Sequence, residues 1–162
     1  MGVMAIIGRT FAAIALLVCG ACTTLPPAHN EPAPQARPPK APAQLAADEA
    51  TRMVGMRYRF GGATPQSGFD CSGLVHYSFV RAGMRVPRTT EEQLRASRPV
   101  RPSELRPGDL LFFDERGKKN GHVAIYLGDL VFVHAPSSGK RVRRDRLDSP
   151  FWSRQLSDIR RL

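Results

Sequence analysis

Apolar residues recur in a helical pattern directly after Asp70. This stripe consists of Leu74, Val75, Phe79 and Val80. Their spacing near four residues predicts an amphipathic helix that ends at Gly83. Asp70 is suited to cap the first turn, because its carboxylate can accept a backbone N–H, and Gly68 lets the chain turn into the helix. Gly73 is a poor helix former, so we expect a backbone or a ligand to approach closely there.

Two further helices and a set of strands are expected around this helix. A helix is predicted near residues 45–53, and a short one begins at Thr89, where Glu92 completes a capping box. The second half of the chain carries short apolar runs separated by turn signals, which is typical of strands. The expected strands cover residues 109–114, 122–128, 130–135, 140–144 and 157–162. Helices followed by antiparallel strands predict an α+β domain.

Two of these strands bring a pair of histidines together. His122 lies six residues before Gly128, and His134 lies six residues after it. A hairpin folded about Gly128 would place them opposite one another on the same face, with Cβ atoms about 5 Å apart. A slip of one residue in register would put them on opposite faces. The rest of that face consists of Ala124, Tyr126 and Phe132. We expect the start of the helix described above to pack against it.

The N-terminal residues have the pattern of an export signal. A single positive charge at Arg9 precedes an apolar run over residues 11–19, which is too short to span a bilayer. The following Gly-Ala-Cys resembles the lipobox of bacterial lipoproteins, which predicts cleavage before Cys22 and lipidation of that residue. Cys19 stands where the pattern usually has Leu, so an ordinary secretory signal is the alternative. Thr23 is compatible with sorting to the outer membrane.

The chain, 162 residues long, is sufficient for one ordinary domain beyond this signal. Residues 26–43 form a Pro- and Ala-rich tract that cannot bury a core and is expected to be extended. We therefore expect a signal peptide over residues 1–21, a flexible tether over residues 22–44 and a folded domain over residues 45–162.

The chain is strongly basic, with a net charge of +10 and a pI near 10.5. Nucleic acid is a common partner of such proteins. However, an exported chain without a nucleic-acid motif argues against that partner. An anionic cell-wall polymer or lipid headgroups fit the expected compartment better. The densest basic run, residues 139–146, is interpreted as a solvated strand edge.

Cys71 is the candidate nucleophile. Of the three cysteines, Cys19 would leave with the signal and Cys22 would carry lipid, so Cys71 would remain as a lone thiol in an oxidising compartment. This excludes a disulfide framework and a Cys-rich zinc site. The first turn of a helix favours an anion, so a lowered thiol pKa is predicted. The alternative is a small apolar side chain packed at a helix start.

A thiol at a helix start beside two imidazoles forms a set of nucleophile, base and orienting residue. His76 lies about 140° around the helix from the thiol and is not expected to take part. A mononuclear metal site built from Cys71 and the two histidines is the competing interpretation. It lacks the closely spaced ligand pair that zinc sites usually contain.

Six motifs make the chain resemble the NlpC family of bacterial cell-wall cysteine peptidases. They are YRFGG at 58–62, GFDCSGLV at 68–75, VPRTTEEQ at 86–93, RPGDLLFF at 106–113, GHVAIYLG at 121–128 and FVHAPSSG at 132–139. The resemblance covers roughly residues 45–162. It implies a circularly rearranged papain-like fold, in which the helix that begins with the nucleophile packs on an antiparallel sheet. The layout with a short tether is similar to that of murein endopeptidase lipoproteins of Gram-negative envelopes.

The resemblance also implies roles for individual residues. Cys71 matches the nucleophile, His122 the general base and His134 the residue that orients the base. Tyr58 matches a tyrosine that can help to hold the oxyanion or the substrate. Asp70 and Ser72 match positions close to the substrate, although capping alone would account for Asp70. No metal and no cofactor are required.

The implied reaction is hydrolysis of stem-peptide bonds in peptidoglycan. The favoured bond is the cross-link from D-Ala to diaminopimelate, by analogy with the lipoprotein layout, and the alternative is the bond from γ-D-Glu to diaminopimelate. Two competing hypotheses are a non-catalytic wall-binding lipoprotein and an acyltransferase or amidase that acts on lipid. We expect a monomer at the periplasmic face of the outer membrane, attached through lipid on Cys22, with peptidoglycan and not nucleic acid as its partner.

Overall fold

A computed structural model describes residues 39–115, 117–137 and 139–162. The predicted signal peptide, the lipidation site at Cys22 and residues 22–38 of the predicted tether lie outside the described residues. Within the described ranges, no helix is both long enough and apolar enough to cross a membrane.

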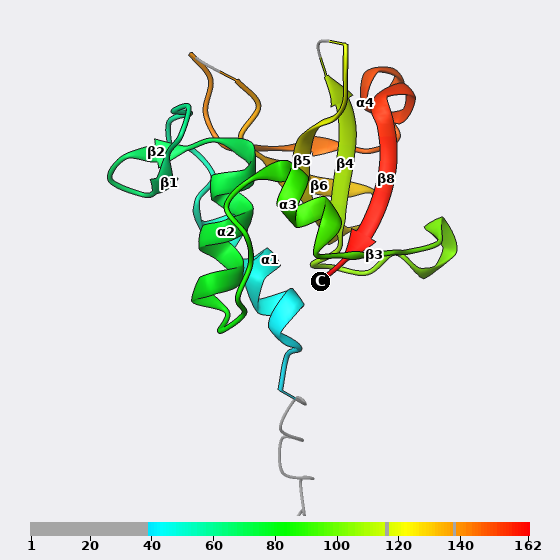
Figure 1. The fold of residues 1–162 in the computed structure, drawn as a ribbon, viewed down its shortest axis with the longest axis horizontal. Helices are drawn as coiled ribbons and strands as arrows, with labels where there is room; N and C mark the ends of the chain where they lie inside the picture. Colours follow the sequence, from blue (N-terminus) through cyan, green and yellow to red (C-terminus); the bar gives the residue numbers. More distant parts are fainter. Residues whose placement is uncertain (1–38, 116, 138) are drawn as a thin grey trace, which may run out of the picture. The chain divides into compact units, whose positions relative to one another are not determined.

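A six-stranded antiparallel sheet forms the centre of the fold (Figure 1). Its strands, in chain order, are β3 Arg98–Pro99, β4 Leu110–Glu115, β5 Lys118–Gly128, β6 Val131–His134, β7 Arg143–Arg146 and β8 Leu156–Arg161. Their order across the sheet is β3-β8-β4-β5-β6-β7, so β8 at the C-terminus inserts beside β4. A separate two-stranded ladder joins β1 Ala63–Thr64 to β2 Gly68–Phe69. The strands predicted from the sequence are found, but β7 begins three residues later than expected.

The helices are α1 Pro42–Arg52, α2 Cys71–Arg81, α3 Thr90–Arg95 and α4 Pro150–Gln155, with a 3₁₀ turn at Pro102–Glu104. The sequence pattern predicts the first three, but not α4 or strands β1 to β3. Helix α1 begins at Pro42, where proline suits the first helical position. Helix α1 therefore includes residues 42–44, at the end of the predicted tether.

The two faces of the sheet carry different layers. Helices α1, α2 and α3 gather on one side of the sheet, while α4 lies near the ends of β4 and β8 (Figure 1). The helix layer packs Leu74 and Phe79 against Val123, Ile125 and Val133. The opposite face packs Ala124, Tyr126 and Phe132 with Trp152 of α4. The expectation that α2 packs on the Ala124 face is therefore wrong.

The β5–β6 hairpin differs in register from the prediction but keeps its consequence. The turn residues are Asp129 and Leu130, both with positive φ, so the hairpin is centred between them and not on Gly128. A bulge between Tyr126 and Gly128 then adds one residue to β5. Tyr126 pairs with Phe132, so the two histidines are not directly opposite. The displaced turn alone would have put them on opposite faces, and the bulge restores a common face.

Candidate active site

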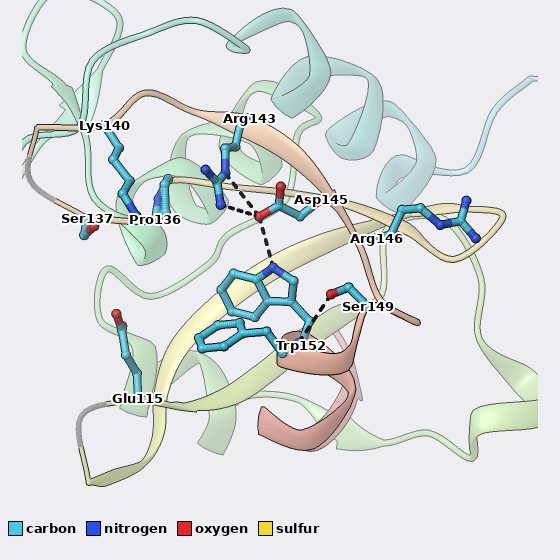
Figure 2. Close-up of a pocket in the computed structure, with 10 residues that line it drawn as sticks. Glu115, Pro136, Ser137, Lys140, Arg143, Asp145, Arg146, Ser149 and Trp152 are labelled. Carbon is cyan, nitrogen blue, oxygen red and sulfur yellow. Dashed lines mark hydrogen bonds and ion pairs between the residues drawn. The ribbon is translucent and has the colours of Figure 1, made fainter.

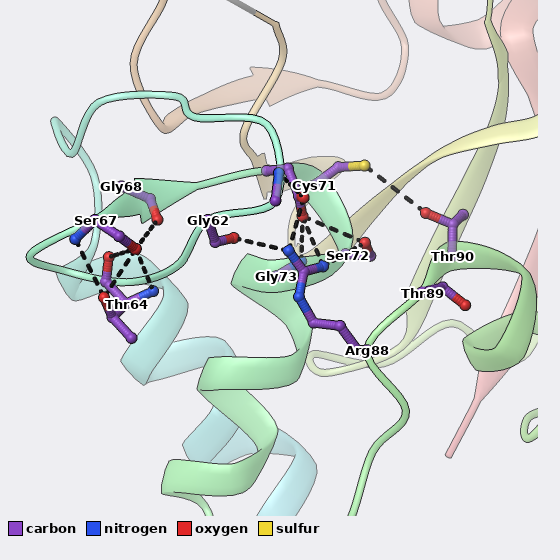
Figure 3. Close-up of polar contacts among 12 residues, drawn as sticks. Gly62, Thr64, Ser67, Gly68, Cys71, Ser72, Gly73, Arg88, Thr89 and Thr90 are labelled. Carbon is purple, nitrogen blue, oxygen red and sulfur yellow. Dashed lines mark hydrogen bonds and ion pairs between the residues drawn. The ribbon is translucent and has the colours of Figure 1, made fainter.

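Cys71 is the first residue of α2 and is partly exposed. It lies in the wall of a pocket of about 640 Å³ that Tyr58, Ser72 and His122 also line. Its Sγ is 3.8 Å from Thr90 Oγ1, at the start of α3 (Figure 3). The structure thus brings the thiol and the first of the two histidines to one pocket.

The environment of the thiol differs from the prediction. Burial raises the pKa of Cys71 above its ordinary value, and the negative charge of Asp70 adds to this. Hydrogen bonds from the Val123 backbone, the Thr90 hydroxyl and the Ser72 backbone oppose the effect without reversing it. The predicted lowering of the pKa of Cys71 is therefore not found, and the thiol is neutral at pH 7.

His122 and His134 are both buried and are hydrogen-bonded to each other. His122 is 2% exposed, and its Nε2 lies 2.8 Å from Nδ1 of His134. The other ring nitrogen of His122, Nδ1, lies 3.7 Å from Glu115 Oε2. Trp152 stacks on the His122 ring with 5.9 Å between ring centroids and 25° between planes. Packing on both sides thus fixes the imidazole, as expected for an oriented base.

Asp145 contacts His134 on the side away from His122. The three side chains His122, His134 and Asp145 therefore form one hydrogen-bonded row, called the catalytic row below. Oδ2 of Asp145 lies 3.1 Å from Nε2 of His134, and Trp152 Nε1 donates to the same oxygen at 3.0 Å (Figure 2). Arg143 donates to it through Nη2 at 2.7 Å and Nε at 3.1 Å. Burial alone would raise the pKa of the Asp145 carboxyl, but the hydrogen bonds from His134 and Arg143 lower it to about 2. Asp145 is therefore ionised and can only accept.

These contacts determine which ring nitrogens carry protons. Since Asp145 accepts, Nε2 of His134 is the protonated nitrogen and Nδ1 is the acceptor. That acceptor receives the N–H from Nε2 of His122, which leaves Nδ1 of His122 with a free lone pair. Burial, followed by the charge of His134, lowers the pKa of His122 to about 3. Burial also lowers the pKa of His134. His122 is thus a neutral base at physiological pH.

A second network fixes the helix start. Asp70 caps α2 as predicted, because Oδ1 accepts from the Gly73 N–H at 2.7 Å, and its Oδ2 also accepts from the Gly61 N–H at 2.8 Å. Arg88 pairs with Asp70 through Nη1 at 2.9 Å and Nη2 at 2.7 Å. The same guanidinium donates to the Gly62 carbonyl at 3.1 Å (Figure 3). The cap is therefore tied to two other segments of the chain.

Gly73 is required by a close backbone contact. A Cβ at this position would lie 2.0 Å from the Gly62 carbonyl oxygen, which no side chain could tolerate. The predicted close approach is confirmed, and the approaching group is a backbone. The loop before β1 therefore lies directly against the first turn of α2.

The remaining candidate residues are placed as follows. Tyr58 and Ser72 line the pocket with Cys71, and Ser72 Oγ accepts from Arg88 at 3.0 Å. His76 turns away and places Nδ1 2.7 Å from the Val86 carbonyl oxygen. Among the described residues, no group of three or more His, Cys, Asp or Glu side chains could hold a metal ion.

Three important residues do not emerge from the sequence pattern. Asp145 lies within the basic run that the pattern presents as a solvated edge, and β7 is indeed an edge strand. Trp152 lies in α4, which has six residues and is too short for a periodic pattern. Arg88 lies in one of the six motifs, but nothing in the motif points to its pairing with Asp70. The single signal available is an isolated carboxylate among arginines, which suggests a specific partner.

Comparison with known proteins gives consistent matches. Residues 55–161 match the family model described as the NlpC/P60 family. The chain is 37% identical over 123 residues to the murein DD-endopeptidase MepH of Escherichia coli, covering 74% of this chain and 45% of that protein. It is 36% identical over 122 residues to the γ-DL-glutamyl hydrolase of Bacillus subtilis, covering 74% of this chain and 30% of that protein.

A solved structure agrees with these matches. An NLP/P60 family protein from Staphylococcus aureus, described as similar to lipoprotein, has a TM-score of 0.66 and 36% sequence identity to the chain. The match covers 74% of this chain and 41% of that one. The chain thus spans less than half the length of each of these three relatives.

Proposed function

Because this chain belongs to the NlpC/P60 family, we propose that it is a cysteine-type peptidase that hydrolyses stem-peptide bonds of peptidoglycan. Its helices packed on an antiparallel sheet form the papain-like α+β fold that the sequence predicts. The observation that carries the proposal is the row from His122 through His134 to Asp145, which leaves the lone pair of His122 Nδ1 free beside the Cys71 pocket. This is the arrangement of an oriented general base next to a nucleophile.

The first chemical step follows from the protonation states. The Cys71 thiol and the His122 imidazole are both neutral, so Nδ1 takes the thiol proton as Sγ attacks the peptide carbonyl. The imidazolium that forms is stabilised by His134 and Asp145 behind it and by the Glu115 carboxylate, 3.7 Å from Nδ1. Backbone N–H groups at the start of α2, with the Tyr58 hydroxyl, stabilise the tetrahedral oxyanion.

The later steps regenerate the enzyme. Nδ1 of His122 gives its proton to the leaving amine, the C–N bond breaks, and a thioester remains on Cys71. A water molecule then loses a proton to the same nitrogen and attacks the thioester, which releases the acid and restores the thiol. No step requires a metal or a cofactor.

The favoured bond is the cross-link from D-Ala to diaminopimelate. The name of the MepH relative is that of a DD-endopeptidase, and the name of the Bacillus subtilis relative is that of a γ-DL-glutamyl hydrolase. The lipoprotein layout predicted from the sequence favours the first of these activities. We also propose, from the same sequence pattern, that the protein is a monomer attached to the periplasmic face of the outer membrane through lipid on Cys22.

The products of muropeptide digestion test the proposal. The purified protein is incubated with cross-linked muropeptide dimers, and the products are identified by mass spectrometry. Cleavage of the cross-link predicts loss of dimers with gain of intact tetrapeptide monomers. Dipeptide products would instead assign the bond after γ-D-Glu. Binding without products would support a wall-binding lipoprotein, and transfer of acyl chains without cleavage would support an enzyme that modifies lipid.

A further inference from the structure

Figure 2 shows the residues that line a second pocket, which has a volume of about 400 Å³. Glu115 and Pro136 belong to the walls of both pockets. A substrate that fills the catalytic pocket can therefore extend into the second one. Its size is within the range of pockets that bind small molecules or parts of larger ones.

The second pocket is lined by three cations, Lys140, Arg143 and Arg146, and by two carboxylates, Asp145 and Glu115. The Asp145 carboxylate is already engaged, because Arg143, Trp152 and His134 all contact its Oδ2. Among the described residues, no ion pair of Lys140 is found, and its charge is close enough to His134 to contribute to the lowering of the pKa of that imidazole. Arg143 pairs with Asp145 and Arg146 pairs with Asp148, so in the described part of the chain Lys140 is the cation of this pocket that remains for an anionic ligand.

The other residues of the pocket wall suit a ligand that has an aliphatic segment between polar groups. Phe151 is 58% exposed, an unusual position for a large apolar side chain, and its ring packs edge-on against Trp152 at 4.9 Å between centroids. Ser137 and Ser149 add hydroxyl groups. An aliphatic segment can lie on the Phe151 ring while a carboxylate reaches Lys140.

The position of the pocket relative to the catalytic row indicates which half of the substrate enters it. His122 gives its proton to the leaving amine, and His134 and Asp145 lie behind His122. The pocket lies on the Asp145 side of this row. The half of the substrate that carries the leaving amine therefore extends from His122 towards Lys140.

From this geometry we propose that the second pocket binds the diaminopimelate carboxylate beside the cross-linked amine, with Lys140 as its counter-ion. This proposal rests on the proposed endopeptidase function and makes it more specific. In the cross-link, the carbon that bears the leaving amine also bears a free carboxylate. In the bond after γ-D-Glu, the corresponding carboxyl is joined to the next residue in the stem. Lys140 would thus favour the cross-link.

A binding experiment tests this proposal without depending on turnover. The Cys71→Ser protein is titrated calorimetrically with muropeptide dimers whose carboxyl beside the cross-link is free or amidated. The Lys140→Gln and Lys119→Gln substitutions are each added to this background. Lys119 is a matched control, because it is an exposed lysine that lines neither of the two pockets.

We expect Lys140→Gln to weaken binding of the free-carboxylate dimer about 5-fold, the upper end for solvent-exposed ion pairs, and to leave the amidated dimer unchanged. Lys119→Gln should change neither. Equal weakening of both dimers by Lys140→Gln, or no weakening of either, would overturn the proposal. Digestion of the free-carboxylate dimer by the protein with Cys71 intact is measured separately. Failure to cut it would refute the proposed function, while the titration would still decide whether the pocket binds the carboxylate.

Discussion

Replacement of Asp145 by asparagine tests whether the catalytic row acts as one unit. The side chain keeps its shape, but the charged acceptor for His134 is lost, and the new amide can donate to Nε2 of His134 and so reverse the direction of the hydrogen bonds. Nε2 of His122 would then accept a hydrogen bond from Nδ1–H of His134, and the proton of His122 would lie on Nδ1, which loses its free lone pair.

The expected loss can be estimated from the contacts. Asp145 Oδ2 accepts from His134 at 3.1 Å and stabilises the imidazolium through that ring. Replacing a charge-assisted hydrogen bond by a neutral one removes roughly 1 to 3 kcal/mol, so kcat is expected to fall about 5- to 150-fold. The loss is read from kcat, because Asp145 does not line the catalytic pocket but does line the second pocket, where its charge affects KM.

Steady-state digestion of muropeptide dimers measures this loss, with two controls. Asp148→Asn is a matched substitution, because Asp148 pairs with Arg146 near the same sheet edge and contacts neither histidine. It should leave kcat unchanged. In a His134→Asn background, Asp145 can no longer reach the base, and Asp145→Asn should have no further effect. An equal loss of kcat in both backgrounds would refute the coupled row.

Four further tests probe the helix start, the thiol and the buried base. Gly73→Ala should prevent correct docking of the loop on α2 and lower the free energy of unfolding by several kcal/mol, measured by urea titration; a loss within about 0.5 kcal/mol would contradict the 2.0 Å contact. Arg88→Lys should lower the free energy of unfolding by about 2 kcal/mol and reduce kcat, because an ammonium cannot reproduce the two contacts with Asp70. Thermal stability and kcat equal to those of the unmodified protein would contradict the role of Arg88 in fixing the helix start. Because burial raises the pKa of Cys71, alkylation by iodoacetamide should show a midpoint above about 8.5, the value of a free thiol, and a midpoint well below it would contradict the neutral thiol. The pKa of His122 is about 3 in the folded protein and 6.5 in the unfolded chain, so the unfolded chain binds more protons between these pH values. The free energy of unfolding should therefore fall, by on the order of a few kcal/mol, as the pH drops through this window. Urea unfolding at pH 7 and pH 4 should show a smaller fall for His122→Gln than for the unmodified protein, and an equal fall would contradict the assignment.

The parts of the site that follow from local patterns can be predicted from the sequence. The cap at Asp70 and the place of Cys71 in the first turn depend only on neighbouring residues, and both are found in the structure. A glycine within a helical pattern also signals the close approach at Gly73, but the sequence does not identify the approaching carbonyl, which belongs to Gly62. Local sequence is a sufficient guide where the constraint is local.

The histidine pair shows the limit of this approach. The turn is centred between Asp129 and Leu130 instead of on Gly128, and the two histidines share a face because a one-residue bulge in β5 restores the alternation of the pairing. A bulge leaves little signal in the sequence, so the agreement depends on two compensating shifts. The predicted packing of α2 on the other sheet face is wrong for a related reason, since alternation along a strand does not say which layer covers which face.

Asp145 and Trp152, which lie behind the base, could not be predicted from the sequence. Both are remote in sequence from His122, and both lie in short elements. Asp145 is recognisable only once β7 lies beside β6. Trp152 is brought to the histidines by a six-residue helix, whose Ser149 cap and Pro150 give too weak a signal. The helix end alone predicts a lowered thiol pKa, while the structure adds the burial that raises it.

The role of Cys71 as the nucleophile is decided by turnover of cross-linked muropeptide dimers by the unmodified protein and by the Cys71→Ser protein, with dimer binding measured in the same samples. We expect the Cys71→Ser protein to bind dimers with the affinity of the unmodified protein and to release no monomers. Release of monomers at the same rate by both proteins would contradict the assignment of Cys71 as the nucleophile.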